Sequence, residues 1–330
     1  MTAVRAPEFW ARDGVVPTLL APLATLYAAA GATRAMLATP FRAAIPVICV
    51  GNLVAGGAGK TPVALSLAAL LRARGCRPHV VTRGYGGRLA GPVRVDTTRH
   101  GAVEIGDEAL LLARVAPCWV ARDRVAGVKA AIEAGADVVL LDDGFQNPTL
   151  AKDLSLIVVD GAYGFGNSQV MPAGPLREPI EAGLARADAV ILIGVDESGV
   201  AAVVDSRLPI LRATVEPQGG GDLAGSRVLA FAGIGRPAKF YATLAGLGAE
   251  IVARVDFPDH HRYRDDEIAR LAAAAATAGA RLVTTAKDFV RLPQTWRDGI
   301  GVLDVAIAWR EPDRLNALLE RALSPTPVRG

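Results

Sequence analysis

The chain has 330 residues, of which 51% are hydrophobic and 21% charged, and its formal net charge is +3. This length allows one large or two medium domains, and the composition is typical of a globular α/β protein, which excludes a disordered or fibrous chain. No basic patch is interleaved with aromatic residues, so we expect no nucleic-acid binding. The three cysteines, Cys49, Cys76 and Cys118, match no metal-ligand spacing and indicate a reducing compartment without disulfides.

The first predicted element is an apolar segment that carries no charge, from Val15 to Ala32. Its length meets the lower limit for a membrane-spanning helix. However, Pro17 and Pro22 interrupt the segment, and its Ala, Thr and Gly residues insert weakly into a bilayer. Two interpretations remain open: a helix on a membrane surface, or an apolar helix packed on the protein itself. A transmembrane span is less favoured than either.

From residue 45 onward, β-branched runs alternate with segments of helical periodicity. The predicted strands are Ile45–Val50, His79–Thr82, Cys118–Val120, Val138–Leu141, Leu154–Val159 and Ala189–Ile193, and the predicted helices between them include Pro62–Arg74, Asp107–Arg114 and Asp123–Ala134. Apolar strands separated by crossover helices indicate a mostly parallel sheet with helices on both faces.

A domain boundary is predicted near Glu216–Leu223, where Pro217, Gln218 and a run of glycines carry no apolar period. Beyond it the alternation restarts with a strand at Arg227–Ala232. The chain therefore divides into an N-terminal segment (1–36), a nucleotide-binding α/β domain (37–216) and a smaller C-terminal α/β domain (217–330).

The most specific motif is a glycine-rich loop between the first strand and the first helix. Its backbone can wrap around phosphates while the helix presents its positive end, Lys60 can reach the β- and γ-phosphates, and the Thr61 hydroxyl can bind Mg²⁺. The general P-loop pattern requires glycine where Val54 stands, and the loop is a G-G-x-G-K-T variant. The predicted ATP-binding residues of the loop are Val54, Ala55, Gly56, Gly57, Ala58, Gly59, Lys60 and Thr61.

A second motif places Asp142 and Asp143 at the end of an apolar strand. In open α/β sheets ligands bind at the carboxyl ends of the strands, so these carboxylates are candidates for Mg²⁺ binding beside the P-loop. An aspartate at a strand end is by itself an ordinary turn or capping residue. Which of the two would bind the metal stays open.

Other polar clusters are candidates for phosphate contact or proton transfer. Arg83 and Tyr85 lie in a glycine-rich turn that suits nucleotide contact, or only a surface turn. Asp107 and Glu108 open a helix, where capping alone would favour acidic residues. Arg177, in a proline-bounded loop, can neutralise phosphoryl charge or form a surface ion pair.

Two clusters of this kind lie in the C-terminal part. His260 and His261 follow Asp259 in a loop, where a histidine can accept a proton or contact phosphate, although a lone one is usually solvated. The Thr284–Asp288 segment ends a strand, and its Lys287 adds a cation or merely accompanies a helix cap.

Together these motifs resemble the tetraacyldisaccharide 4′-kinase family of the lipid A pathway, over nearly the whole chain. The resemblance rests on segments that occur in the order of that family, namely Val50–Asn52 with Gly56–Pro62, Arg83–Gly86, Gly106–Glu108, Asp142–Gln146, Gly174–Glu178 and Asp259–His261. The valine at position 54 agrees with the family's own version of the P-loop.

The resemblance implies transfer of the γ-phosphate of MgATP to the 4′-hydroxyl of a tetraacyldisaccharide 1-phosphate, which gives lipid IVA. It implies that Asp107 accepts the proton with support from His260, for which His261 is the alternative, that Arg177 faces the phosphates or the sugar head group, and that Glu108, Asp142 and Asp143 lie near the metal. The expected partners are the lipid-linked disaccharide and the inner-membrane surface, on its cytoplasmic face, with no obligate protein partner.

The main alternative is a membrane-associated switch ATPase with a deviant P-loop. Such ATPases carry an additional lysine early in the loop, at the position of Leu53 or Val54, and none is present here. The Asp-His-His and Pro-Leu-Arg-Glu segments also have no role in that alternative. A nucleotide-binding module without catalysis is a third, weaker possibility.

Overall fold

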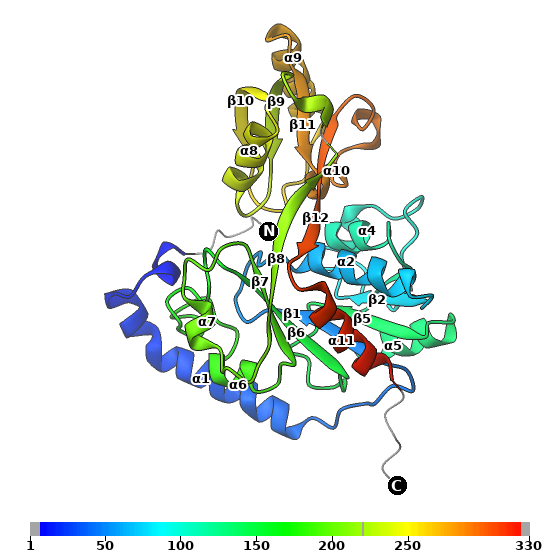
Figure 1. The fold of residues 1–330 in the computed structure, drawn as a ribbon. Helices are drawn as coiled ribbons and strands as arrows, with labels where there is room; N and C mark the ends of the chain where they lie inside the picture. Colours follow the sequence, from blue (N-terminus) through cyan, green and yellow to red (C-terminus); the bar gives the residue numbers. More distant parts are fainter. Residues whose placement is uncertain (1–6, 220, 325–330) are drawn as a thin grey trace.

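The computed structural model describes residues 7–219 and 221–324, so residues 1–6 and 325–330 of the predicted terminal parts and Gly220 of the predicted linker lie outside the described residues. Two lobes lie one above the other (Figure 1). We call residues 7–209 together with the last helix the P-loop lobe, and residues 221–300 the C-terminal lobe. A single twelve-stranded sheet runs through both lobes, in the order β10-β9-β11-β12-β8-β7-β6-β1-β5-β2-β4-β3.

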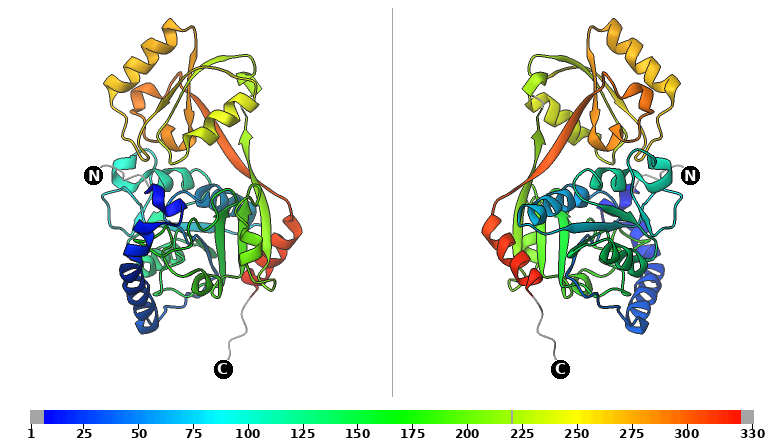
Figure 2. Two further views of the ribbon diagram at one scale, coloured as in Figure 1. Left: turned by 90° about the vertical axis from the view of Figure 1, so that its left-hand side faces the viewer. Right: turned by 90° about the vertical axis from the view of Figure 1, so that its right-hand side faces the viewer.

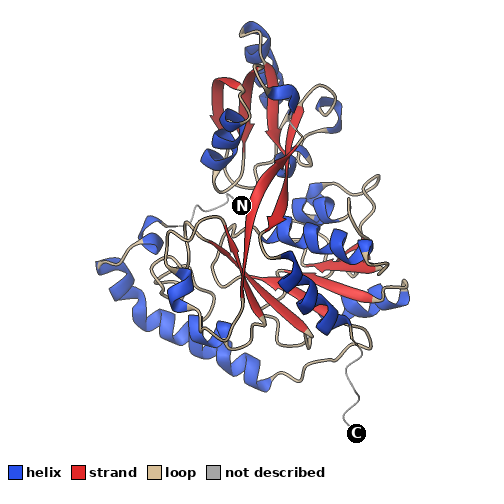
Figure 3. Ribbon diagram, in the orientation of Figure 1, coloured by secondary structure: helices blue, strands red, loops and turns tan. Residues whose placement is uncertain are grey.

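The strands of the P-loop lobe form the predicted parallel sheet (Figure 3). Only the short β3 is antiparallel to its neighbour β4 in this lobe. The strands are β1 (Val47–Gly51), β2 (Pro78–Thr82), β3 (Val93–Arg94), β4 (Cys118–Val120), β5 (Val138–Asp142), β6 (Leu154–Asp160) and β7 (Ala189–Ile193). Most of their residues are buried on both faces, as expected for a parallel sheet covered by helices.

Helices cover both faces of this sheet. One face packs against α2 (Lys60–Ala73), α4 (Asp107–Leu112) and α11 (Pro312–Leu323). The other packs against α5 (Arg124–Glu133), α6 (Ile180–Leu184) and α7 (Val200–Val203). The remaining helices of this lobe are η1 (Glu8–Ala11), α1 (Val15–Leu37) and α3 (Ala102–Ile105). Cys49 and Cys118 are buried in strands as small apolar side chains, as predicted, and all three cysteines are free.

The C-terminal lobe is the predicted smaller α/β unit. Parallel strands form its sheet, with α8 packed on one face and α9 on the other. Its elements are η2 (Gly221–Leu223), β9 (Arg227–Ala232), α8 (Pro237–Gly246), β10 (Glu250–Asp256), α9 (Asp265–Thr277), β11 (Arg281–Thr285), α10 (Ala286–Phe289) and η3 (Gln294–Trp296).

Two long antiparallel strands connect the lobes, β8 (Ile210–Gln218) and β12 (Gly301–Trp309) (Figure 2). The predicted linker is not irregular at its start, because β8 continues to Gln218 and Pro217 lies opposite Val305. After β12 the chain returns to the P-loop lobe as α11. The domain division at residue 217 stays a prediction, and it falls inside β8.

The apolar N-terminal segment forms one continuous helix, α1, along the outside of the P-loop lobe (Figure 1). The expectation that prolines interrupt it is wrong. Pro17 lies in the first turn, where its missing N–H has no helical partner to lose, and Pro22 costs a single helical hydrogen bond. Among the described residues, α1 is the helix long and apolar enough to cross a membrane, and its most apolar 18-residue window is only 11% buried. This exposure disfavours the alternative in which the helix is packed on the protein itself.

Candidate active site

The site lies where the carboxyl ends of the P-loop lobe's strands face the C-terminal lobe. The glycine-rich loop leaves β1 at Gly51 and enters α2 at Lys60. Gly59 has φ 84°, and a Cβ there would lie 2.6 Å from Ile193 Cδ1, so only glycine fits without displacing that side chain. The first backbone N–H groups of α2 have no acceptor within the helix, which makes this end an anion-binding position.

The start of the loop is held by buried hydrogen bonds. The Asn52 side chain is fully buried and donates to Val54 O at 2.7 Å. Ala55 N–H donates to Pro175 O at 2.7 Å. The Ala55 amide therefore already has an acceptor, and the amides available to a phosphate are those from Gly56 onward.

Lys60 and Arg177 converge on one carboxylate, that of Asp143. Arg177 donates to it through two nitrogens, at 2.9 and 3.3 Å, and Lys60 Nζ lies 3.5 Å from Oδ1. Burial acts to raise the pKa of Asp143, but the two cations outweigh burial and lower it. Asp143 also has φ 54°, in the left-handed region that non-glycine residues adopt rarely and aspartate more readily than most. The structure thus pairs Arg177 with an acid inside the site and not on the outer surface.

Asp142 differs from its neighbour in its surroundings. It is buried, its Oδ2 accepts a hydrogen bond from Thr82 at 3.1 Å, and its Oδ1 has no partner among the described residues. Burial, and then the charges of Glu108 and Asp143, raise the pKa of Asp142 to about 7. A buried carboxylate oxygen without a partner fits a Mg²⁺ ligand, because Mg²⁺ takes one or two protein carboxylates together with phosphates and water.

Where the two lobes meet, Asp107 contacts residues of the C-terminal lobe. Its Oδ2 lies 2.9 Å from His260 Nδ1 and 3.4 Å from Arg291 Nε. Burial acts to raise the pKa of Asp107, but the His260 hydrogen bond and the charges of Lys287 and Arg291 lower it to about 2. The Asp107 carboxylate is therefore ionised at neutral pH and held from two sides.

The backbone before Asp107 and the loop carrying His260 fix this contact. Gly106 has φ 84°, and a Cβ there would lie 2.3 Å from Tyr85 O. The Tyr85 ring in turn lies beside the His260 ring, with centroids 5.5 Å apart. His260 has φ 58°, and its backbone N–H donates to Gly233 O.

Lys287 connects this pair to the second acid. Its Nζ lies 3.6 Å from Glu108 Oε1 and 3.5 Å from His260 Nε2. Because an ammonium group can only donate, a hydrogen bond to Nε2 requires His260 to carry its proton on Nδ1, facing Asp107. Burial acts to lower the pKa of Lys287, but Glu108 and Asp107 outweigh burial and raise it.

The comparisons with known proteins agree with this geometry. The sequence model of the family described as tetraacyldisaccharide-1-P 4'-kinase matches residues 16–324. The chain belongs to this family. It is 56% identical over 328 residues to the tetraacyldisaccharide 4'-kinase of Rhodospirillum centenum, which covers 97% of each chain. It is 54% identical to that of Gluconacetobacter diazotrophicus, covering 96% of this chain and 98% of the relative.

A solved structure supports the same assignment. The crystal structure of LpxK from Aquifex aeolicus in complex with ATP matches with a TM-score of 0.79 and 27% identity, covering 94% of this chain and all of that chain. The likeness confirms the predicted P-loop fold with its smaller second lobe and N-terminal apolar helix. The kinase family resemblance inferred from the ordered motifs is likewise confirmed, and the switch-ATPase alternative is not favoured.

The structure brings most of the predicted site residues to one region, where the carboxyl ends of the P-loop lobe's strands face the C-terminal lobe. Arg83 and Tyr85 are exposed, although the Tyr85 ring lies beside the His260 ring. His261 does not contact Asp107, and its Nε2 lies 3.0 Å from Glu267 Oε2 within its own lobe. The geometry therefore favours His260 over His261 as the partner of Asp107.

Two arginines at the site were missed by sequence reasoning. Arg291 is 8% exposed and contacts both Asp107 and Asp288. Arg124 is 4% exposed at the start of α5, its pKa is lowered mainly by burial, and its Nε has no partner among the described residues. Neither arginine belongs to a recognisable motif. The one signal in the sequence is that each arginine lies near an end of a predicted or observed helix next to a strand.

Proposed function

We propose that the chain transfers the γ-phosphoryl group of MgATP to the 4′-hydroxyl of a tetraacylated glucosamine disaccharide 1-phosphate, giving lipid IVA. Family membership and the likeness to an ATP-bound relative support this proposal. The observation that carries it is Asp107, an ionised carboxylate fixed 2.9 Å from His260 at the edge of the P-loop site. A site for ATP alone would not need this pair.

The residues around the P-loop bind and orient the nucleotide. The amides from Gly56 to Thr61 and the Lys60 ammonium receive the phosphates, and Thr61, Asp142 and Glu108 would hold Mg²⁺, with Asp143 beside them. Mg²⁺ neutralises charge on the phosphate oxygens when it is bound. Once the phosphates arrive, Lys60 and Arg177 exchange the Asp143 carboxylate for phosphate oxygens.

Asp107 takes the proton of the acceptor hydroxyl. As the new oxygen–phosphorus bond forms and the bond to the β-phosphate oxygen breaks, the hydroxyl proton passes to the Asp107 carboxylate and ADP leaves. A carboxylate with a pKa of about 2 is a weak base. This suits a loose phosphoryl-transfer transition state, in which the hydroxyl loses its proton late and its orientation matters most. His260 holds the carboxylate in that orientation.

The exposed apolar side chains of α1 fit attachment to the membrane that carries the substrate. They include Leu19, Leu23 and Leu26, which are 72%, 54% and 67% exposed. A helix that buries such side chains in the interfacial region gains free energy from each of them. We place the chain on the cytoplasmic face of the inner membrane, where ATP is available, with the acyl chains of the substrate remaining in the bilayer.

Labelled γ-phosphate from ATP provides the test. The intact protein, in detergent, is expected to move label to tetraacyldisaccharide 1-phosphate and not to an analogue that lacks the 4′-hydroxyl. Hydrolysis of ATP without labelled lipid, stimulated by membranes, would instead support a switch ATPase. Label on the analogue would show that another hydroxyl is the acceptor.

A further inference from the structure

The turn that precedes α1 is fastened to a loop of the P-loop lobe. In η1, the Trp10 indole N–H donates to Pro172 O at 3.0 Å. In the opposite direction, Asn167 N–H donates to Trp10 O at 2.9 Å, and the Asn167 side-chain amide donates to Phe9 O at 3.2 Å. These three bonds join segments more than 150 positions apart in the sequence.

The other end of the same loop is fastened to the phosphate loop. Pro175 O accepts the Ala55 N–H at 2.7 Å, and Arg177 N–H donates to Leu53 O at 2.8 Å. Between them Leu176, only 1% exposed, forms an antiparallel bridge with Val54. The backbone of the phosphate loop's first half therefore takes its position from this short segment.

Internal bonds make the segment between these two attachments compact. Leu176 N–H donates to Gln169 O at 3.0 Å, and Met171 N–H donates to Leu176 O at 2.8 Å. The junction leaves no room for even a methyl group, since a Cβ at Gly174 would lie 2.1 Å from Asn167 Oδ1. A Cβ at Gly166 would lie 2.7 Å from Trp10 O. A displacement at Trp10 is therefore passed on to the Pro172–Arg177 segment and not absorbed by empty space.

We propose that Trp10 is a positioning residue for the phosphate loop. Its indole bond holds Pro172, and the Pro172–Arg177 segment in turn holds Leu53–Ala55 and brings Arg177 to the site. Because α1 begins only a few residues after Trp10, the exposed helix α1 and the nucleotide site share one anchor. The inference rests on the proposed function only in taking ATP as the nucleotide.

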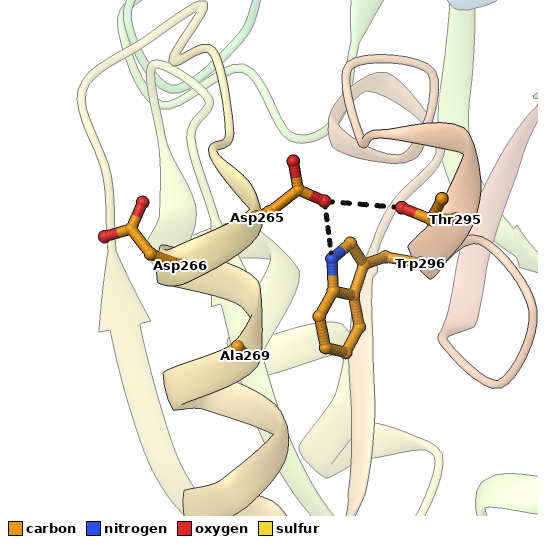
Figure 4. A pocket seen from close by; sticks show the side chains of 5 residues that line it. All are labelled: Asp265, Asp266, Ala269, Thr295 and Trp296. Atoms are coloured by element: carbon orange, nitrogen blue, oxygen red, sulfur yellow. Dashed lines mark hydrogen bonds between the residues drawn. The ribbon is translucent and has the colours of Figure 1, made fainter.

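The matched experiment compares two tryptophans that each lose an indole hydrogen bond. Trp10→Phe removes the bond to Pro172 and keeps an aromatic ring. Trp296→Phe removes the indole bond to Asp265, 2.9 Å long, at a shallow pocket of the C-terminal lobe lined also by Thr295 (Figure 4). The non-hydrolysable analogue AMPPNP with Mg²⁺, titrated calorimetrically into each full-length variant in detergent, reports nucleotide affinity without any phosphoryl transfer.

Trp10→Phe is expected to weaken AMPPNP binding about three- to tenfold, the effect of losing one partly buried hydrogen bond that orders a binding loop. The KM of Trp10→Phe for ATP should rise, while its kcat at saturating ATP stays near that of the wild type. Trp296→Phe should change neither the affinity for AMPPNP nor the KM for ATP. Asn167→Ala, which removes the second attachment, should weaken AMPPNP binding in the same direction.

Affinity within twofold of the wild type in both Trp10→Phe and Asn167→Ala would overturn the inference. So would an equal loss in Trp296→Phe, because the effect would then be a general loss of stability. Failure of the proposed function looks different. In that case nucleotide binding would still depend on Trp10, while no label would reach the lipid in the wild type.

Discussion

The two sides of the candidate site are built in different ways. The proposed phosphate-binding side is a single stretch of chain that passes from β1 through the glycine-rich loop into α2. The facing side is assembled from separate elements, because His260, Lys287 and Arg291 reach Asp107 and Glu108 only when the lobes are docked. The difference teaches that the proposed phosphate-binding loop is encoded locally in this chain, whereas the surroundings of the proposed proton acceptor, Asp107, depend on the arrangement of the lobes.

The largest effect is expected on the local side. Lys60→Ala removes the cation proposed to balance the charge of the phosphates, and kcat/KM should fall about 10³-fold. The control is Lys129→Ala on the exposed surface of α5, which should retain full activity. Initial rates of label transfer to the lipid measure both. A Lys60→Ala variant with more than a tenth of wild-type activity would remove Lys60 from the phosphate site.

The facing side gives the next largest effect. His260→Asn removes the side chain that holds Asp107, and kcat should fall by about 10²-fold with little change in KM for ATP. His261→Asn is the matched control, because His261 bonds Glu267 in its own lobe. Steady-state kinetics of the pair decides between the two histidines, and a larger loss in His261→Asn would reverse their assignment.

The proposed membrane contact of α1 should be independent of both sides of the site. Replacing Leu19 and Leu23 together by serine removes two exposed leucines from α1, and affinity for anionic vesicles should fall about tenfold or more. Binding of AMPPNP should not change. Co-sedimentation with vesicles measures the affinity for the membrane. Unchanged sedimentation would mean that this face of α1 does not enter the bilayer.

The smallest effect concerns a second contact between the lobes. Asp160, at the end of β6, accepts bonds from Arg236 at 2.7 Å and Lys239 at 2.8 Å. These cations are partly exposed, so Asp160→Asn should cost roughly two- to fivefold in kcat/KM.

The control for this contact is Asp205→Asn, which breaks an ion pair within one lobe. Small-angle scattering with and without AMPPNP should show a wider spread of lobe positions for Asp160→Asn than for the control. Identical scattering profiles for the two variants would show that the Asp160 contact does not hold the lobes together.

The predictability of each part follows the same division. The strand–loop–helix order around Lys60 and the strand ending in Asp142 were predicted because periodicity and glycine placement act over a few residues. The observed ends of the elements differ slightly from the predicted ones. For example, the first strand begins at Val47, whereas it was predicted to begin at Ile45. Pro217 was expected in an irregular linker, yet pairing with β12 keeps it in a strand.

Long-range features could not be obtained in this way. The exposure of α1 depends on what the rest of the chain leaves uncovered, and composition alone favoured no choice between surface and core. Arg291 and Arg124 carry no local pattern, since their burial comes from the packing of elements distant in sequence. Lys287 stayed undecided for the same reason, because its bond partners Glu108 and His260 come from two different lobes.

The most direct test of the proposed role of the Asp107–His260 pair is a double-mutant cycle between these two residues. Label transfer would be measured for Asp107→Asn, His260→Asn and the double variant, with thermal unfolding confirming that each is folded. If His260 acts by holding Asp107, the double variant should be about as slow as Asp107→Asn alone. Losses that add in full would contradict the account, because the two side chains would then act independently.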